Sequence, residues 1–115
     1  MTAALRLDED ALDDLFLALA SRTRREILDI VSREPGCTVG AVSERFEMSR
    51  IGIHKHLAVL EEAGLIVSER RGRERRLWFN AVPIRWIHER WSERYREFWA
   101  GRLVRLKLEA ERSER

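Results

Sequence analysis

The stretch Met48–Leu65 reads MSRIGIHKHLAVLEEAGL, and it decides the fold. Three of its apolar residues recur at helical spacing: Ile53, Leu57 and Leu60. This spacing predicts a helix over Ser49–Ala63 with one buried face. Ser49 is a typical N-cap, and Gly64 can adopt the left-handed conformation that ends many helices.

The residues before this helix predict another helix only a few positions away. Thr38 is a plausible N-cap. Apolar residues follow at helical spacing: Val39, Val42 and Phe46. Only Glu47 and Met48 then precede the Ser49 cap. Two helices joined by so short a connection are typical of a helix-turn-helix motif.

Two further helices are expected closer to the N-terminus. The first runs from about Asp10 to Ala20, and its apolar positions are Leu12, Leu15, Phe16 and Leu19. The second opens at Thr23, which with Glu26 forms the pattern of a capping box. Pro35 and Gly36 should end this second helix.

After Gly64 the pattern changes to that of a β-hairpin. Leu65-Ile66-Val67 and Leu77-Trp78-Phe79 are apolar, and a basic segment around Gly72 separates them. Pro83 suits the first turn of a last helix that should continue to about Glu109, roughly 40 Å at ~1.5 Å per residue. The predicted fold is therefore mainly α with a small two-stranded β-hairpin, a winged helix-turn-helix of about five helices. We expect one domain over residues 10–110, with flexible termini at 1–9 and 111–115.

Positive charge gathers in two of these segments although the net charge is only +2. Residues 48–60 hold two bases and no acid, and residues 69–76 hold five arginines against two glutamates. Such clusters suit the phosphates of double-stranded DNA. Chance clustering and a merely solvated helix face stay open as alternatives, because the chain holds twenty arginines.

The second helix of a helix-turn-helix presents its first turns to base edges in the major groove. Once the apolar face is removed, the candidate DNA-binding residues there are Ser49, Arg50, Ile51, Gly52, His54, Lys55 and His56. Arg50 could pair with guanine, and Ile51 could contact a thymine methyl group. From the hairpin we add Arg71, Arg73 and Arg75 as contacts to the DNA backbone or minor groove.

These residues also carry a family resemblance. Met48–Leu65 resembles the recognition helix of ArsR-type winged-helix repressors, and the stretch LALASRTRREILDIV (Leu17–Val31) resembles the start of that domain. The tail PIRWIHERWSERYREFWAGRLVRLK (Pro83–Lys107) is similar to a subgroup with a tryptophan-rich last helix. The resemblance covers about residues 12–108. It implies a homodimer that represses a promoter, with base-reading residues at Ser49, Arg50, Ile51 and His54.

The chain departs from the metal-sensing members of that family. They carry a cysteine-rich box on the helix before the recognition helix, where this chain reads TVGAVSERF with a single cysteine, Cys37, just before it. One thiolate cannot supply the ligands that a zinc or arsenite site needs, so we expect no metal site and no cofactor. A lowered pKa at Cys37 would make that residue a redox-sensitive thiol, which stays open as an alternative.

The apolar residues of the last helix reach further than a small core can cover. We therefore predict a dimer interface that combines this helix with the first one, formed by Leu12, Leu15, Phe16, Trp91, Tyr95, Phe98 and Leu103. Two-fold symmetry would place two recognition helices about one DNA turn, ~34 Å, apart, on an inverted repeat. Ile84 and Ile87 could instead pack in the core, and the tryptophans could line a ligand pocket.

Other classes of protein fit the sequence less well. It has no phosphate-cradling motif, no spaced acid pair and no partner set for Cys37, so an enzyme is not expected. We also expect no membrane segment, no secretory signal, a cytoplasmic location, and no metal or small-molecule effector. The main alternative to a DNA-binding repressor is a winged-helix module that binds another protein and not DNA.

Overall fold

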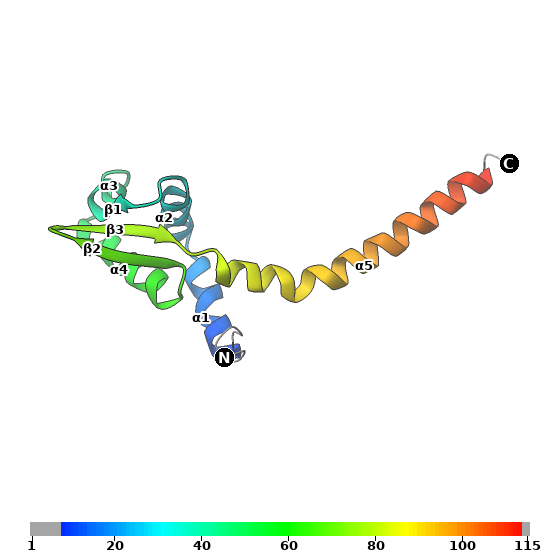
Figure 1. Cartoon of the computed structure of the whole chain (residues 1–115), viewed down its shortest axis with the longest axis horizontal. Coiled ribbons are helices and arrows are strands. Elements are labelled where there is room, and N and C mark those ends of the chain that lie inside the picture. Colours follow the sequence, from blue (N-terminus) through cyan, green and yellow to red (C-terminus); the bar gives the residue numbers. More distant parts are fainter. Residues whose placement is uncertain (1–7, 114–115) are drawn as a thin grey trace. The chain divides into compact units, whose positions relative to one another are not determined.

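The computed structural model describes residues 8–113, with only the backbone described at Glu93. By their internal contacts these residues form two units, which divide between Pro83 and Ile84. The first unit holds the helices α1–α4 and a small sheet, and the second is made by the last helix, α5 (Figure 1). None of the described helices combines the length and the apolar character needed to cross a membrane.

The first two helices are α1 (Glu9–Leu19) and α2 (Arg22–Arg33). The predicted start of α2 at Thr23 is wrong, because Ser21 is the N-cap and its hydroxyl accepts from the backbone N–H of Arg24 at 3.3 Å. Glu26 forms no capping box there; its carboxylate instead pairs with Arg22 one turn earlier, at 3.3 Å.

The helix-turn-helix consists of α3 (Val39–Ser43) and α4 (Arg50–Glu62). Both predicted N-caps are confirmed: Thr38 Oγ1 accepts from the Ala41 N–H at 3.1 Å, and Ser49 Oγ accepts from the Gly52 N–H at 3.1 Å. The helix α3 ends at Ser43, earlier than the apolar spacing predicts. Gly64 follows α4 with a φ of 77°, as expected of a residue that ends a helix in the left-handed region.

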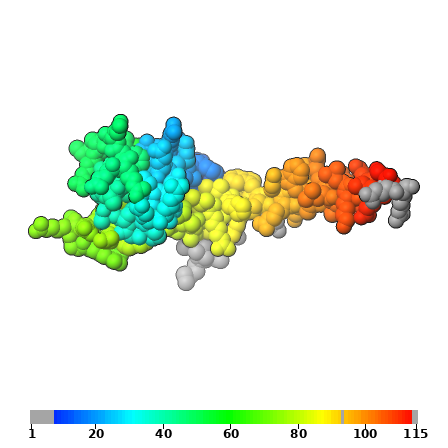
Figure 2. All heavy atoms as spheres, turned by 90° about the horizontal axis from the view of Figure 1, so that it is seen from above, coloured from blue at the N-terminus to red at the C-terminus, as the bar shows by residue number. Residues whose placement is uncertain are grey.

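The sheet has three antiparallel strands in the order β1-β3-β2: β1 (Cys37–Thr38), β2 (Ile66–Arg71) and β3 (Glu74–Phe79). The predicted hairpin is β2–β3, which we call the wing, and its turn lies at Gly72 with a φ of 64°. The strand β1 was not expected, because two residues are too few to show an alternating pattern. The tip of the wing protrudes from the body of the first unit (Figure 2).

The core is apolar throughout the described residues, since no polar or charged residue there is buried. Its fully buried large side chains come from the helices, from the base of the wing and from the turn before it: Leu15, Ile27, Val31, Val42, Ile53, Leu57, Leu60, Leu65 and Leu77. The predicted inward face of α4 is thus confirmed. This core fixes α4 beside the wing, which positions the candidate site.

The helix α5 spans Val82–Ser113, about 48 Å at ~1.5 Å per residue. Pro83 lies in its first turn, as predicted. It continues past the predicted end at Glu109. Parts of the predicted flexible termini belong to helices: Asp8 caps α1, Glu9 begins it, and residues 111–113 belong to α5. Residues 1–7 and 114–115 lie outside the described residues.

Candidate nucleic-acid interface

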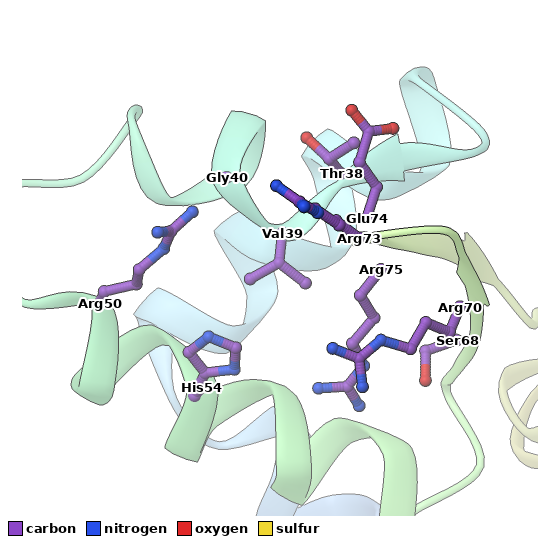
Figure 3. A pocket seen from close by; sticks show the side chains of 10 residues that line it. All are labelled: Thr38, Val39, Gly40, Arg50, His54, Ser68, Arg70, Arg73, Glu74 and Arg75. Carbon is purple, nitrogen blue, oxygen red and sulfur yellow. The ribbon is translucent and has the colours of Figure 1, made fainter.

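A groove of the first unit runs between the start of α4, the start of α3 and the wing (Figure 3). Its charged lining is mostly basic: Arg50 from α4, and Arg70, Arg73, Arg75 and the acid Glu74 from the wing; His54 of α4 also lines it. Since two of the elements that line it, α4 and the wing, are those with clustered positive charge in the sequence, the groove gathers that charge on one surface.

The first turns of α4 present a polar, exposed face beside this groove. Ser49, His54 and Lys55 are exposed, and the Ile51 side chain is 70% exposed. Since Ile53 is fully buried one position before His54, the helix separates an inward set from an outward set. At Gly52 an added Cβ would meet neighbours only at ordinary contact distances of 3.4 Å or more, so packing inside the protein does not require glycine there.

Arg50 lies against the neighbouring helix of the motif. Its guanidinium points toward Gly40 of α3 (Figure 3). A Cβ built at Gly40 would lie 3.1 Å from Arg50 Nη2, closer than most contacts of such atoms. The absence of a side chain at Gly40 therefore makes room for the Arg50 guanidinium.

His56 differs from its predicted companions, because it contacts another helix of the first unit. Its Nδ1 atom lies 3.3 Å from Arg24 Nη1 of α2, and the residue is only half-exposed. Burial lowers the pKa of His56 from 6.5, and the nearby Arg24 charge lowers it further. A neutral imidazole can accept the Arg24 hydrogen bond at Nδ1 while its proton stays on Nε2.

The wing arginines fall into two groups that the sequence did not separate. Arg75 pairs with Glu61 of α4, and Arg76 pairs with Glu74 at 2.8 Å. Arg71 lies 5.3 Å from the centre of the Trp78 ring and 3.5 Å from the Glu69 carboxylate. Among the described residues, Arg70 and Arg73 have no such partner, and both line the groove.

Arg70 is a groove residue that the sequence reasoning missed. The strand register places it directly opposite Arg75, on the face that also carries Ser68. Arg71 is one position along, so its side chain belongs to the opposite face. Counting alternate positions from the buried Ile66 leads to Ser68 and Arg70, but only once it is known that Ile66 faces the core and that β2 reaches Arg71.

The described residues contain no group of three or more His, Cys, Asp and Glu side chains suited to holding a metal ion. Cys37 is a free, half-buried thiol, and burial together with the Glu34 charge raises its pKa. A redox-sensitive thiol needs the opposite shift, because the thiolate is the reactive form. The lowered pKa considered for Cys37 is therefore wrong.

The residues predicted to form a dimer interface have two different surroundings. Leu12 and Leu15 are buried, at 6% and 0% exposure, so of the three on α1 only Phe16, at 42%, has surface left for a partner. The four on α5 are about half-exposed or more: Trp91, Tyr95, Phe98 and Leu103. Trp99 adds to this apolar surface through edge-on contacts with the rings of Tyr95 and Phe98, with centroids 6.0 and 5.7 Å apart.

Comparison with known proteins gives these features a family context. A family model described as a helix-turn-helix domain matches residues 19–69. An uncharacterized HTH-type transcriptional regulator of Bacillus subtilis (strain 168), YuzN, is 39% identical over 70% of this chain and 95% of its own length. The transcriptional repressor SdpR of the same organism is 34% identical over 53% of this chain and 67% of its own.

Solved structures agree with this result. The crystal structure of an ArsR family transcriptional regulator is 31% identical, covers 82% of this chain and 95% of its own, and has a TM-score of 0.70. A homodimeric winged helix-turn-helix DNA-binding domain from Mycobacterium bovis shares the fold at 22% identity and a TM-score of 0.61, over 84% of this chain and 89% of its own. With a helix-turn-helix, a wing and relatives of this similarity along most of its length, the chain belongs to the ArsR-type winged helix-turn-helix family of transcriptional regulators.

Proposed function

We propose that this protein is a repressor that binds an inverted repeat in double-stranded DNA as a homodimer. The observation that carries the proposal is the basic groove, in which Arg50, Arg70 and Arg73 lie on the two elements that a winged helix-turn-helix applies to DNA. Phosphate oxygens attract such cations, and the counterions released on binding favour the complex.

Base recognition is assigned to the exposed start of α4. Arg50 can donate two parallel hydrogen bonds to guanine, and the exposed Ile51 side chain can contact a thymine methyl group. Gly52 lets the helix backbone approach the DNA, which agrees with the absence of an internal packing reason for glycine at that position. Ser49, His54 and Lys55 contact base edges or phosphates beside them.

The wing supplies contacts to the DNA backbone. Arg70 and Arg73 are the wing cations that we assign to phosphates, because no acid of the described part of the chain neutralises either of them. Each such contact should add to the dependence of binding on salt.

A second copy of the chain is the partner that we assign to the apolar surface of α5. The side chains of Trp91, Tyr95 and Phe98 are 48–64% exposed, and their burial in a dimer would remove apolar surface from water. The homodimeric Mycobacterium bovis domain of the same fold supports this assignment, and the similarity to a transcriptional repressor supports repression as the outcome of binding.

Selection of bound duplexes from a random pool tests the proposal, because recovery of a palindrome would establish both sequence-specific binding and two-fold symmetry. Arg50→Ala should then weaken binding to the selected site by about 1–3 kcal/mol and relax the preference at one base pair. Arg33→Ala is the matched control, since it removes an exposed arginine from the last turn of α2, which is not among the residues that line the groove. Recovery of no sequence, with equally weak binding at low and high salt, would favour a protein partner instead.

A further inference from the structure

Arg75 lines the groove, but its charge is already paired within the protein. Its guanidinium contacts the carboxylate of Glu61, and the two side chains are only 36% and 26% exposed. Glu61 lies in the last turn of α4, where the partial negative charge of the helix end adds to the attraction for a cation. Arg75 is therefore directed toward the C-terminal half of α4, away from the turns that carry Arg50 and Ile51.

Of the hydrogen bonds and ion pairs among the described residues, this one is the outermost between the wing and the helices. Closer to the base, the wing is held by buried residues such as Leu77, by the pairing of β3 with β1, and by a hydrogen bond from Arg76 to the Gly36 carbonyl at 2.9 Å. Beyond Arg75, the ion pairs of the tip stay within the wing itself, as between Arg71 and Glu69. The contact between Glu61 and Arg75 thus ties the wing to α4 one residue farther out than the pairing of β3 with β1 does.

The pairing has a second effect on the groove. The register places Arg70 directly opposite Arg75, and two like charges in that arrangement repel each other. The Glu61 carboxylate offsets the charge of Arg75 and so reduces this repulsion. A phosphate contact by Arg75 would separate the pair and leave the Glu61 carboxylate without its cation close to the negatively charged DNA.

We infer that Arg75 is a positioning residue for DNA binding: together with Glu61 it holds the wing at the spacing from α4 that lets Arg70 and Arg73 contact phosphates. The inference rests on the proposed function, and it assigns Arg75 a role different from that of the other two arginines. Glu61 becomes a residue that favours DNA binding although it carries a negative charge.

Glu61→Gln gives the clearest test, because the two possible roles of Arg75 predict opposite signs. The control is Glu62→Gln, which removes the same charge from an exposed position one residue along α4. Affinity is measured by fluorescence anisotropy with a labelled random-sequence duplex of about three helical turns (~30 base pairs), over a series of salt concentrations. Thermal melts of the free proteins accompany each measurement.

If Arg75 positions the wing, Glu61→Gln binds about two- to fivefold more weakly than Glu62→Gln, at a similar melting temperature. Arg75→Gln should also weaken binding but leave the salt slope unchanged, whereas Arg70→Gln should reduce the slope by about 0.9 per protomer.

The opposite pattern overturns the inference. If Arg75 contacts phosphate itself, Glu61→Gln frees it and binds at least as tightly as Glu62→Gln, and Arg75→Gln reduces the salt slope. These results all require that the unaltered protein binds the duplex. If it does not bind at any salt concentration, the proposed function fails as well, and the two failures are thereby distinguished.

Discussion

Replacing Arg24 by methionine should destabilise the fold far more than the same change at its neighbour Arg22. The Arg24 guanidinium donates to two carbonyl oxygens in the last turn of α1, those of Ala18 at 2.7 Å and Leu17 at 2.9 Å. It also lies 3.3 Å from Nδ1 of His56 on α4. Methionine keeps much of the apolar stem but removes every donor, so the link between three helices is lost.

The expected magnitude follows from these contacts. A hydrogen bond that involves a charged group contributes about 1.5–3 kcal/mol when it is shielded from water, and less when it is exposed, as the bond to Leu17 is. Together the contacts of Arg24 should contribute about 2–4 kcal/mol. Arg22 makes one pair with Glu26 at 3.3 Å, and its side chain is 87% exposed, so its loss should cost about 0.3–0.5 kcal/mol.

Urea denaturation followed by circular dichroism provides the comparison. All variants should be measured at one protein concentration, because association would add to the apparent stability. Arg24→Lys serves as a third variant: it keeps the charge but lacks the planar fork, so its stability should lie between those of the unaltered protein and Arg24→Met. A free energy of unfolding for Arg24→Met within about 0.5 kcal/mol of that for Arg22→Met would refute the reasoning.

Three further predictions follow from single features. Gly64→Ala should lower the free energy of unfolding by about 1–2 kcal/mol in the same assay, because a Cβ is strained at a φ of 77°; an unchanged midpoint would contradict this. In an NMR titration His56 should show a pKa below 6.5. Arg24→Met should raise this pKa only part of the way back to 6.5, because burial lowers it more than the Arg24 charge does. Because the folded-state pKa is lowered, the contribution of His56 to stability should be full above about pH 6.5 and decline as the pH falls below it, and a pKa at or above 6.5 would exclude this. Replacing Trp91 and Phe98 by alanine should weaken the dimer in sedimentation velocity, and an intact dimer at low concentration would remove the α5 surface from the interface.

The local signals in the sequence were sufficient for the helix-turn-helix itself. Thr38 and Ser49 are caps whose hydroxyls accept from the third residue on, and that interaction needs nothing beyond the helix it begins. Gly64 and Gly72 likewise mark a helix end and a hairpin turn through their own backbone conformation. Such features are predictable because the residues that create them lie within a few positions of one another.

Features that depend on tertiary contacts were not predictable in the same way. Ser21 and Thr23 are both suitable N-caps, and α2 uses the earlier one, which places the Arg24 and Arg25 side chains where they donate to the last carbonyls of α1. His56 was grouped with exposed residues because its partner, Arg24, lies on a different helix.

The separation of the wing arginines needed still more information. Five arginines in eight residues show a basic segment, but the register decides which of them share a face. The pairing of Arg75 with Glu61 then depends on the packing of the wing beside α4. Neither the register nor the packing leaves a mark on the local pattern of residue types.

The division of α4 into two faces has a consequence for how such a protein can diverge. The three inward side chains, Ile53, Leu57 and Leu60, are all fully buried, whereas Ile51 and Lys55 are exposed and carry no part of the core. Substitutions at the exposed positions should therefore leave the stability of the fold nearly unchanged. After gene duplication, one copy could acquire a new binding preference through a few changes on this face while its scaffold is inherited intact.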